Sequence, residues 1–102
     1  MSDVEVTDNP EENRYEARIG GELAGFAEYH LTKSSIVFTH TETLEQFKGQ
    51  GVATALARHA LDDVRAKGER EVVPVCPFFH GYIDDHAEYA DLVRRHGEGD
   101  SQ

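Results

Sequence analysis

The sequence predicts a small α/β (α+β) domain in which helices pack on a mixed β-sheet. Three observations lead to this fold class: alternating apolar runs on both sides of Gly20-Gly21, a one-sided helical pattern at 51–67, and an apolar strand pattern at 71–76. The alternating runs predict a pair of antiparallel strands, and the helical and apolar patterns predict a strand–helix–strand unit. Together they predict one sheet with both antiparallel and parallel neighbours. With 102 residues, the chain is long enough for one domain, 1–102, with one modest core.

The N-terminal half is expected to consist of strands. Residues 1–12 are acidic with little periodicity, so we expect a ragged and flexible start that contains a short strand at 4–6. Apolar residues alternate before Gly20-Gly21 and again over 23–31. Two glycines between alternating runs predict a hairpin, because a type I′ turn needs positive φ at both central positions. A further strand is expected over 36–41.

The C-terminal half predicts one long helix followed by shorter elements. Apolar residues three and four apart form one stripe, and Gly68 is a natural end for the helix. The strand at 71–76 contains Pro74, which has no N–H for a ladder and marks an edge or a break in pairing. The stripe consists of Ala53, Leu56, Ala57, Ala60, Leu61 and Val64. After the last strand we expect short helical pieces at 78–82 and 86–95 and a flexible polar tail at 97–102.

Charge and composition narrow the class of partner. The chain has 20 acidic and 10 basic residues, which gives a formal net charge of -10. A nucleic-acid binder needs a basic surface to release counterions, so this charge excludes nucleic acid and favours solubility or a cationic acceptor such as an amine. A long apolar run and a basic-then-apolar start are both missing, so we expect no membrane span and no secretory signal. The single cysteine fits a reducing cytoplasm, and we expect a cytoplasmic monomer or weak homodimer.

The stretch 46–53 is the most informative for function. Gly49 and Gly51 lie between a predicted strand and the start of the long helix. A helix N-terminus offers unpaired N–H donors and the positive end of the macrodipole, and glycine lacks the Cβ that would block approach. The segment therefore predicts a site for a phosphate-bearing ligand. A tight helix entry without any ligand is the alternative interpretation.

Three glycine-rich loop patterns compete for this stretch. A Walker loop requires Gly-Lys-Ser/Thr at its end, whereas here Lys48 precedes Gly49. A dinucleotide-binding loop requires a third glycine where Thr54 stands. The third pattern, Gln/Arg-x-x-Gly-x-Gly/Ala at the start of a helix, is matched by Gln46, Gly49 and Gly51. It resembles the pyrophosphate loop with which the GCN5-related N-acetyltransferases (the GNAT family) hold acetyl-coenzyme A.

The resemblance to small single-domain members of this family extends over 15–93 and includes 40–43, the glycine loop and 73–78. It implies a GNAT-like, mostly antiparallel sheet whose central strands splay apart, with the pantetheine arm in the gap. Pro74 agrees with such a loss of pairing. One departure is that the two helices between the first two strands are missing, so the acceptor wall is short or absent. The resemblance implies these coenzyme-binding residues: Thr41, Thr43, Gln46, Lys48, Gly49, Gln50, Gly51, Val52 and Ala53.

Acetyl transfer to an amine requires a polarised thioester carbonyl, a base for the ammonium proton and an acid for the leaving thiolate. Cys76 is a candidate nucleophile for a covalent route or a proton donor to the departing coenzyme, and packing as a small apolar residue is the alternative. His40 is in phase with Phe38, so we expect it on the core side of the sheet as a base near Cys76, with a purely structural histidine as the alternative. Glu42 is an alternative base, unless it is an exposed loop carboxylate without a role. Tyr82 resembles the tyrosine that often acts as general acid in this family, and packing as an aromatic side chain is the alternative.

The sequence therefore favours an acetyl-coenzyme A-binding N-acetyltransferase-like protein with an unidentified amine acceptor. Acetyl-coenzyme A is the expected co-substrate. The alternative is a non-catalytic acyl-coenzyme A-binding or protein-interaction module. No metal is predicted, because the clustered residues match no compact ligand spacing. That cluster consists of His80, Asp84, Asp85 and His86.

Overall fold

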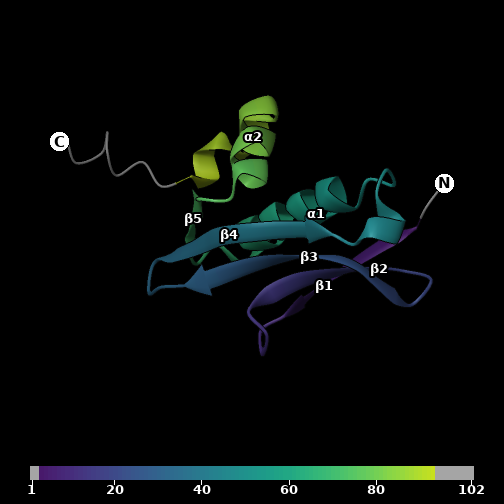
Figure 1. The fold of residues 1–102 in the computed structure, drawn as a ribbon. Coiled ribbons are helices and arrows are strands. Elements are labelled where there is room, and N and C mark those ends of the chain that lie inside the picture. The colour runs from purple at the N-terminus through teal and green to yellow at the C-terminus, as the bar shows by residue number, and fades with distance from the viewer. Residues whose placement is uncertain (1–2, 94–102) are drawn as a thin grey trace.

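The computed structural model describes residues 3–93, which form a five-stranded sheet with two α-helices on one of its sides (Figure 1). The strands lie side by side in chain order. Neighbours from β1 to β4 are antiparallel, and β5 is parallel to β4. This mixed, mostly antiparallel sheet with packed helices confirms the predicted fold class. The elements are β1 (Val4–Asn9), β2 (Arg14–Ile19), β3 (Glu22–Leu31), β4 (Ser35–Thr43), α1 (Val52–Lys67), β5 (Glu71–Pro74), α2 (Pro77–Asp85) and the 3-10 helices η1 (Glu45–Phe47) and η2 (Ala87–Leu92).

The start of the chain is more regular than its composition suggests. The strand expected at 4–6 extends over β1 and pairs with β2 along its whole length. Val4 and Val6 pack against the core, so the strand is held although acidic residues alternate with them. A turn at 10–13 leads directly into β2. The connection between the first two strands is therefore a short turn, as the absence of a helical pattern there predicted.

The expected hairpin joins β2 to β3. Gly20 and Gly21 have φ of 59° and 84°, as a two-residue turn with positive φ at both positions requires. The strand expected over 36–41 is also present and is longer, because β4 begins at Ser35 and ends at Thr43. Local turn chemistry therefore predicts this half of the sheet well.

A bulge in β4 determines which side chains face the helices. Tyr29 pairs with Phe38 but Glu28 pairs with His40, so Thr39 is an extra residue on β4. An extra residue reverses the alternation of faces beyond it. Phe38 is fully buried, whereas the His40 side chain is 54% exposed. The prediction that His40 lies on the core side with Phe38 is therefore wrong, because it assumed an unbroken alternation.

α1 confirms the predicted long helix and supplies six of the twenty buried core residues of the described chain. It begins after Gly51 and ends before Gly68, both in the left-handed conformation. The stripe from Leu56 to Val64 lies against the inner face of the sheet, where Leu56 and Leu61 are fully buried, whereas Ala53 is only partly buried. The first helical residue, Val52, is buried as well. α1 is therefore fixed to the sheet along its whole length.

The last strand is shorter than expected because it ends at Pro74, and the next segment turns into α2 with Cys76 as its N-cap. Phe79 of α2 stacks on Phe38 at 4.2 Å between ring centroids, which holds this helix over β4. The helical pieces expected at 78–82 and 86–95 correspond to α2 and η2. Positions 94–95 and the tail at 97–102 lie outside the described residues.

Candidate active site

The glycine loop leaves the first turn of α1 open. Gly49 and Gly51 have φ of 84° and 78°, which side chains rarely adopt. A Cβ added at either position would meet nothing within 4 Å, so the backbone conformation rather than crowding selects glycine, and the space beside the loop is open. Gly51 caps α1 without a side-chain hydrogen bond, and the first turn contains no acidic residue. The N–H groups of this turn are therefore available to an anion.

A cavity of about 350 Å³ lies over this helix start. Gln46 and Gln50 are exposed beside it rather than among its lining residues. Thr54 also lines the cavity and was not among the predicted residues. Its place in the first turn of the predicted helix, where backbone N–H groups have no partner within the helix, is the signal that could have identified it. The predicted coenzyme-binding residues that line the cavity are Thr43, Lys48, Gly49, Gly51, Val52 and Ala53.

Gly25 on β3 allows the helix start to approach the sheet. A Cβ at this position would lie 2.5 Å from the carbonyl oxygen of Glu42 and 2.8 Å from Cγ1 of Val52. Both distances are shorter than real Cβ contacts, so only glycine fits here without a shift of neighbouring atoms. Because Val52 is the first residue of α1, Gly25 helps to position the open helix end. The sequence does not point to Gly25, because its close contacts are with residues far away in the chain, Glu42 and Val52.

The ladder between β4 and β5 ends well before β4 does. Their ladder covers Ser35–Phe38 of β4 alone, whereas the pairing of β4 with β3 continues to Thr43. The N–H of Cys76 donates to the carbonyl of Phe38 at 2.8 Å, just where the ladder ends. Beyond this point the edge of β4 that faces β5 lies outside the ladder.

Cys76 and Thr41 meet beyond the end of this ladder. Cys76 is only 3% exposed, and its Sγ lies 3.1 Å from Oγ1 of Thr41. Thr41 is turned to this side by the bulge at Thr39, which also turns His40 away. The structure therefore brings two of the predicted site residues, Thr41 and Cys76, into direct contact.

His40 and Glu42 lie together on the opposite face of the sheet. His40 Nε2 and Glu42 Oε1 are 3.1 Å apart, and both side chains are about half exposed. The ring of Phe26 lies beside His40 on this face, at 6.3 Å between centroids. These two candidate bases are therefore separated from Cys76 by the sheet.

Tyr82 lines a second cavity, of about 390 Å³, which includes Thr54 as the first one does. Its ring stacks on His86 at 4.0 Å between centroids, and burial raises the pKa of its hydroxyl. Phe78 lines the same cavity and is 38% exposed. Two aromatic side chains of α2 thus border the space next to the first turn of α1.

Residues 3–93 contain neither a cluster of possible metal ligands nor a helix that could span a membrane. His80 pairs with Asp84 at 3.4 Å, but three or more His, Cys, Asp or Glu side chains do not gather anywhere in this part of the chain. None of its helices is long and apolar enough to cross a membrane.

Comparisons with known proteins agree with this architecture. The ribosomal-protein-alanine N-acetyltransferase from Brucella melitensis biovar Abortus 2308 has a similar structure, with a TM-score of 0.56 and 20% sequence identity over 79% of this chain and 61% of that chain. This likeness concerns the fold, and the chain spans less than two thirds of that neighbour's length. Curated proteins gave no match. A sequence profile described as GCN5-related N-acetyl-transferase matches residues 14–92, and the chain therefore belongs to this family.

Proposed function

We propose that this chain binds acetyl-coenzyme A, with the pyrophosphate on the glycine loop, and transfers the acetyl group to an amine. Family membership supports acetyl transfer in general. The observation that carries the specific proposal is the uncapped start of α1, where Gly49 and Gly51 lie beside an open cavity. Backbone N–H groups and the helix macrodipole suit a pyrophosphate there, and Lys48 adds a positive charge.

The neighbouring features suit the other parts of the coenzyme. The ladder between β4 and β5 ends at Phe38 while β4 continues to Thr43, so a pantetheine arm can lie along the edge of β4 beyond the ladder. The second cavity, next to the first turn of α1, offers Phe78 for contact with the coenzyme. In this arrangement the thioester lies near Thr41 and Cys76.

Two routes of transfer follow from this placement. In the direct route, the amine nitrogen attacks the thioester carbonyl, the C–S bond breaks, and the coenzyme leaves as a thiolate that takes up the proton lost by the amine. In the covalent route, Cys76 sulfur first bonds to the acetyl carbon, the coenzyme C–S bond breaks, and the thiol proton passes to the departing thiolate. The amine then takes the acetyl group from Cys76 and returns a proton to its sulfur. Tyr82 is the candidate acid.

The acceptor side of the site is more open than the coenzyme side. The short turn at 10–13 replaces the helices that form an acceptor wall in ordinary family members. A role for His40 or Glu42 as base requires an acceptor that approaches from the outer face of the sheet, where this pair lies. The same openness favours the second candidate function, a non-catalytic acyl-coenzyme A-binding or protein-interaction module.

The test of coenzyme binding compares two glycines. Gly49 and Gly21 share a φ of 84°, and a Cβ at either would meet nothing within 4 Å. Gly49→Ala and Gly21→Ala should therefore carry the same backbone strain, but only Gly49→Ala places a methyl group beside the proposed pyrophosphate site. We expect calorimetric titration with coenzyme A to show at least tenfold weaker binding for Gly49→Ala alone. Equal affinities in the two variants would overturn the loop assignment.

An assay of acetyl transfer distinguishes the proposed enzyme from a non-catalytic binding module. The protein is incubated with acetyl-coenzyme A and a panel of amines, with free coenzyme thiol and intact protein mass as readouts. Amine-dependent thiol release supports transfer, and an acetyl adduct lost in Cys76→Ala supports the covalent route. Tight coenzyme binding without any amine-dependent release would leave the binding module as the function.

A further inference from the structure

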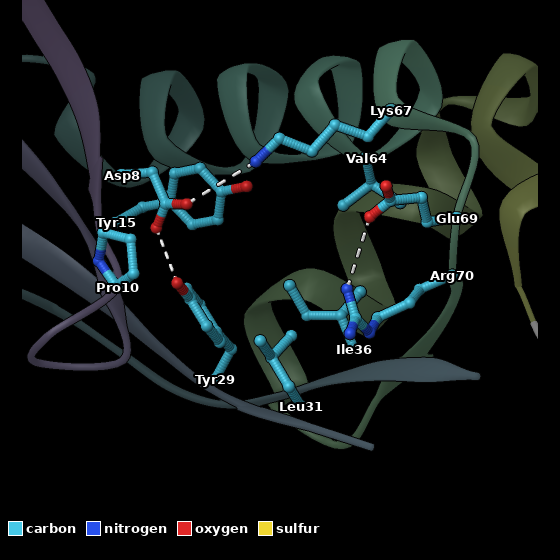
Figure 2. A pocket seen from close by; sticks show the side chains of 10 residues that line it. All are labelled: Asp8, Pro10, Tyr15, Tyr29, Leu31, Ile36, Val64, Lys67, Glu69 and Arg70. Atoms are coloured by element: carbon cyan, nitrogen blue, oxygen red, sulfur yellow. Dashed lines mark hydrogen bonds and ion pairs between the residues drawn. The ribbon is translucent and has the colours of Figure 1, made fainter. Parts of the chain in front are cut away.

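A third cavity, of about 320 Å³, lies at the opposite end of α1 from the glycine loop (Figure 2). Its lining comes from the first four strands, from the last turn of α1 and from the loop before β5. α1 has 16 residues, so the two ends are roughly 24 Å apart at about 1.5 Å per residue. Such a separation places this cavity outside the proposed coenzyme site. Its volume lies in the range of small-molecule sites.

The body of the cavity is apolar. Figure 2 shows Leu31, Ile36, Val64 and the ring of Tyr29 around an open centre. Ile36, Val64 and Tyr29 are buried, whereas Leu31 is 41% exposed and stands at the edge. An aromatic ring or a branched alkyl group that enters this space would remove the apolar surface of both partners from water.

One end of the cavity is already satisfied electrostatically. Asp8 accepts a hydrogen bond from the Tyr29 hydroxyl at 2.6 Å, and Lys67 Nζ lies 3.7 Å from Asp8 and 3.1 Å from Asp63. Lys67 therefore stands between two carboxylates, and Asp8 already has a donor and a cation. A ligand charge of either sign gains little at this end.

The other end retains hydrogen-bonding capacity. Arg70 Nε donates to the carbonyl of Thr32 at 2.9 Å, which fixes the plane of the guanidinium. Its Nη1 lies 3.6 Å from Glu69, longer than a hydrogen bond, and the Glu69 side chain is 67% exposed, so this surface pair is weak. A guanidinium has five N–H donors, and a ligand carboxylate can take two of them side by side.

We propose that this cavity binds a small amphipathic carboxylic acid, with an aromatic or branched aliphatic body against Leu31, Ile36 and Val64 and its carboxylate on Arg70. The net charge of -10 disfavours an anion at long range, but exposed charges beyond about 8 Å are screened at physiological salt. The proposal goes beyond acetyl transfer, because the cavity lies at the far end of α1.

The test is an NMR titration of the ¹⁵N-labelled full chain with three probes of similar shape: 3-phenylpropionate, neutral 3-phenylpropionamide and cationic 3-phenylpropylamine. We expect saturable shifts of the Leu31, Ile36 and Arg70 amides with 3-phenylpropionate. The neutral amide should bind roughly tenfold or more weakly, because it loses charge-assisted hydrogen bonds, and the amine should bind no better than the amide. Equal binding of the acid and the amide, preference for the amine, or no saturable shift with 3-phenylpropionate would overturn the proposal.

A matched pair of variants tests the role of Arg70. Arg70→Gln should weaken 3-phenylpropionate roughly ten- to a hundredfold. Arg58→Gln removes the same charge from an exposed position of α1 outside the cavity and should leave the affinity unchanged. Equal losses in both variants would show a general charge effect and refute the site. Native-like spectra confirm that each variant is folded, and no measurement uses coenzyme A, so failure here is distinguishable from failure of the proposed function.

Discussion

Replacing Gly25 by alanine should destabilise the protein by about 2–3 kcal/mol, which is the cost of inserting an atom into a closely packed site. The added Cβ would lie 2.5 Å from the Glu42 carbonyl oxygen and 2.8 Å from Val52 Cγ1. The first contact is with backbone, which cannot rotate away. Relief therefore requires β3 and β4 to move apart where Gly25 pairs with Thr43, or α1 to shift at its first residue.

The assay is urea unfolding followed by circular dichroism, together with thermal melting. For a chain of this size, about 2–3 kcal/mol corresponds to a fall in Tm of roughly 10–20 °C. Combining Gly25→Ala with Val52→Ala removes the contact with Cγ1 but leaves the contact with the Glu42 carbonyl. The double variant should therefore lose less stability than the sum of the two single losses.

Gly81→Ala is the matched control, because the same substitution should act in the opposite direction. Gly81 lies within α2, and a Cβ there would meet nothing within 4 Å. Alanine in a helix is favoured over glycine by about 0.5–1 kcal/mol, so this variant should be slightly more stable than the wild type. A Gly25→Ala protein as stable as the wild type would refute the steric reasoning, whatever the control shows.

Three further predictions concern polar contacts. Burial opposes ionisation of Glu16, but hydrogen bonds from Arg14, Asn9 and Arg18 outweigh it and hold its pKa below the ordinary 4.5. The resulting stability is present above pH 4.5 and is lost as the pH falls towards the lowered pKa. Glu16→Gln should therefore make the unfolding free energy depend less steeply on pH below 4.5, and an unchanged dependence would contradict this. Tyr15→Phe removes a 2.6 Å hydrogen bond to Asp63 and should cost about 1–2 kcal/mol in urea unfolding, whereas an unchanged midpoint would show that water replaces it. Arg65→Lys loses the bidentate hydrogen bonds to the Asp91 carboxylate and should speed amide hydrogen exchange in η2 but not in α1. Unchanged exchange in η2 would mean that these hydrogen bonds do not stabilise it.

The elements that the sequence predicts correctly are those with local signals. The Gly20-Gly21 turn needs only two glycines and the flanking alternation, and α1 needs only its stripe and the glycines at its ends. The positive φ of Gly49 and Gly51 and the helix start after them are local in the same sense, because they belong to one short segment. These signals depend on neighbouring residues alone.

The features that the sequence does not predict depend on distant partners. His40 was placed on the wrong face because the bulge at Thr39 is set by pairing with β3, and one extra residue reverses every side chain beyond it. The close approach at Gly25 involves Val52, and the hydrogen bond from Tyr15 joins it to Asp63, 48 positions away. Such contacts leave no periodicity in the chain.

Coenzyme A can report whether Gly25 positions the glycine loop or only supports the fold. A ligand that binds the native state stabilises it by about 2.7 kcal/mol at 100 times its Kd. If Gly25→Ala moves the first residue of α1, the variant should gain much less than the wild type at the same coenzyme concentration, because its affinity is lower. Equal gains would mean that the helix start is intact and that the strain is absorbed between β3 and β4. We expect the smaller gain, because the same added atom would contact both Val52 and the β4 backbone next to the proposed site.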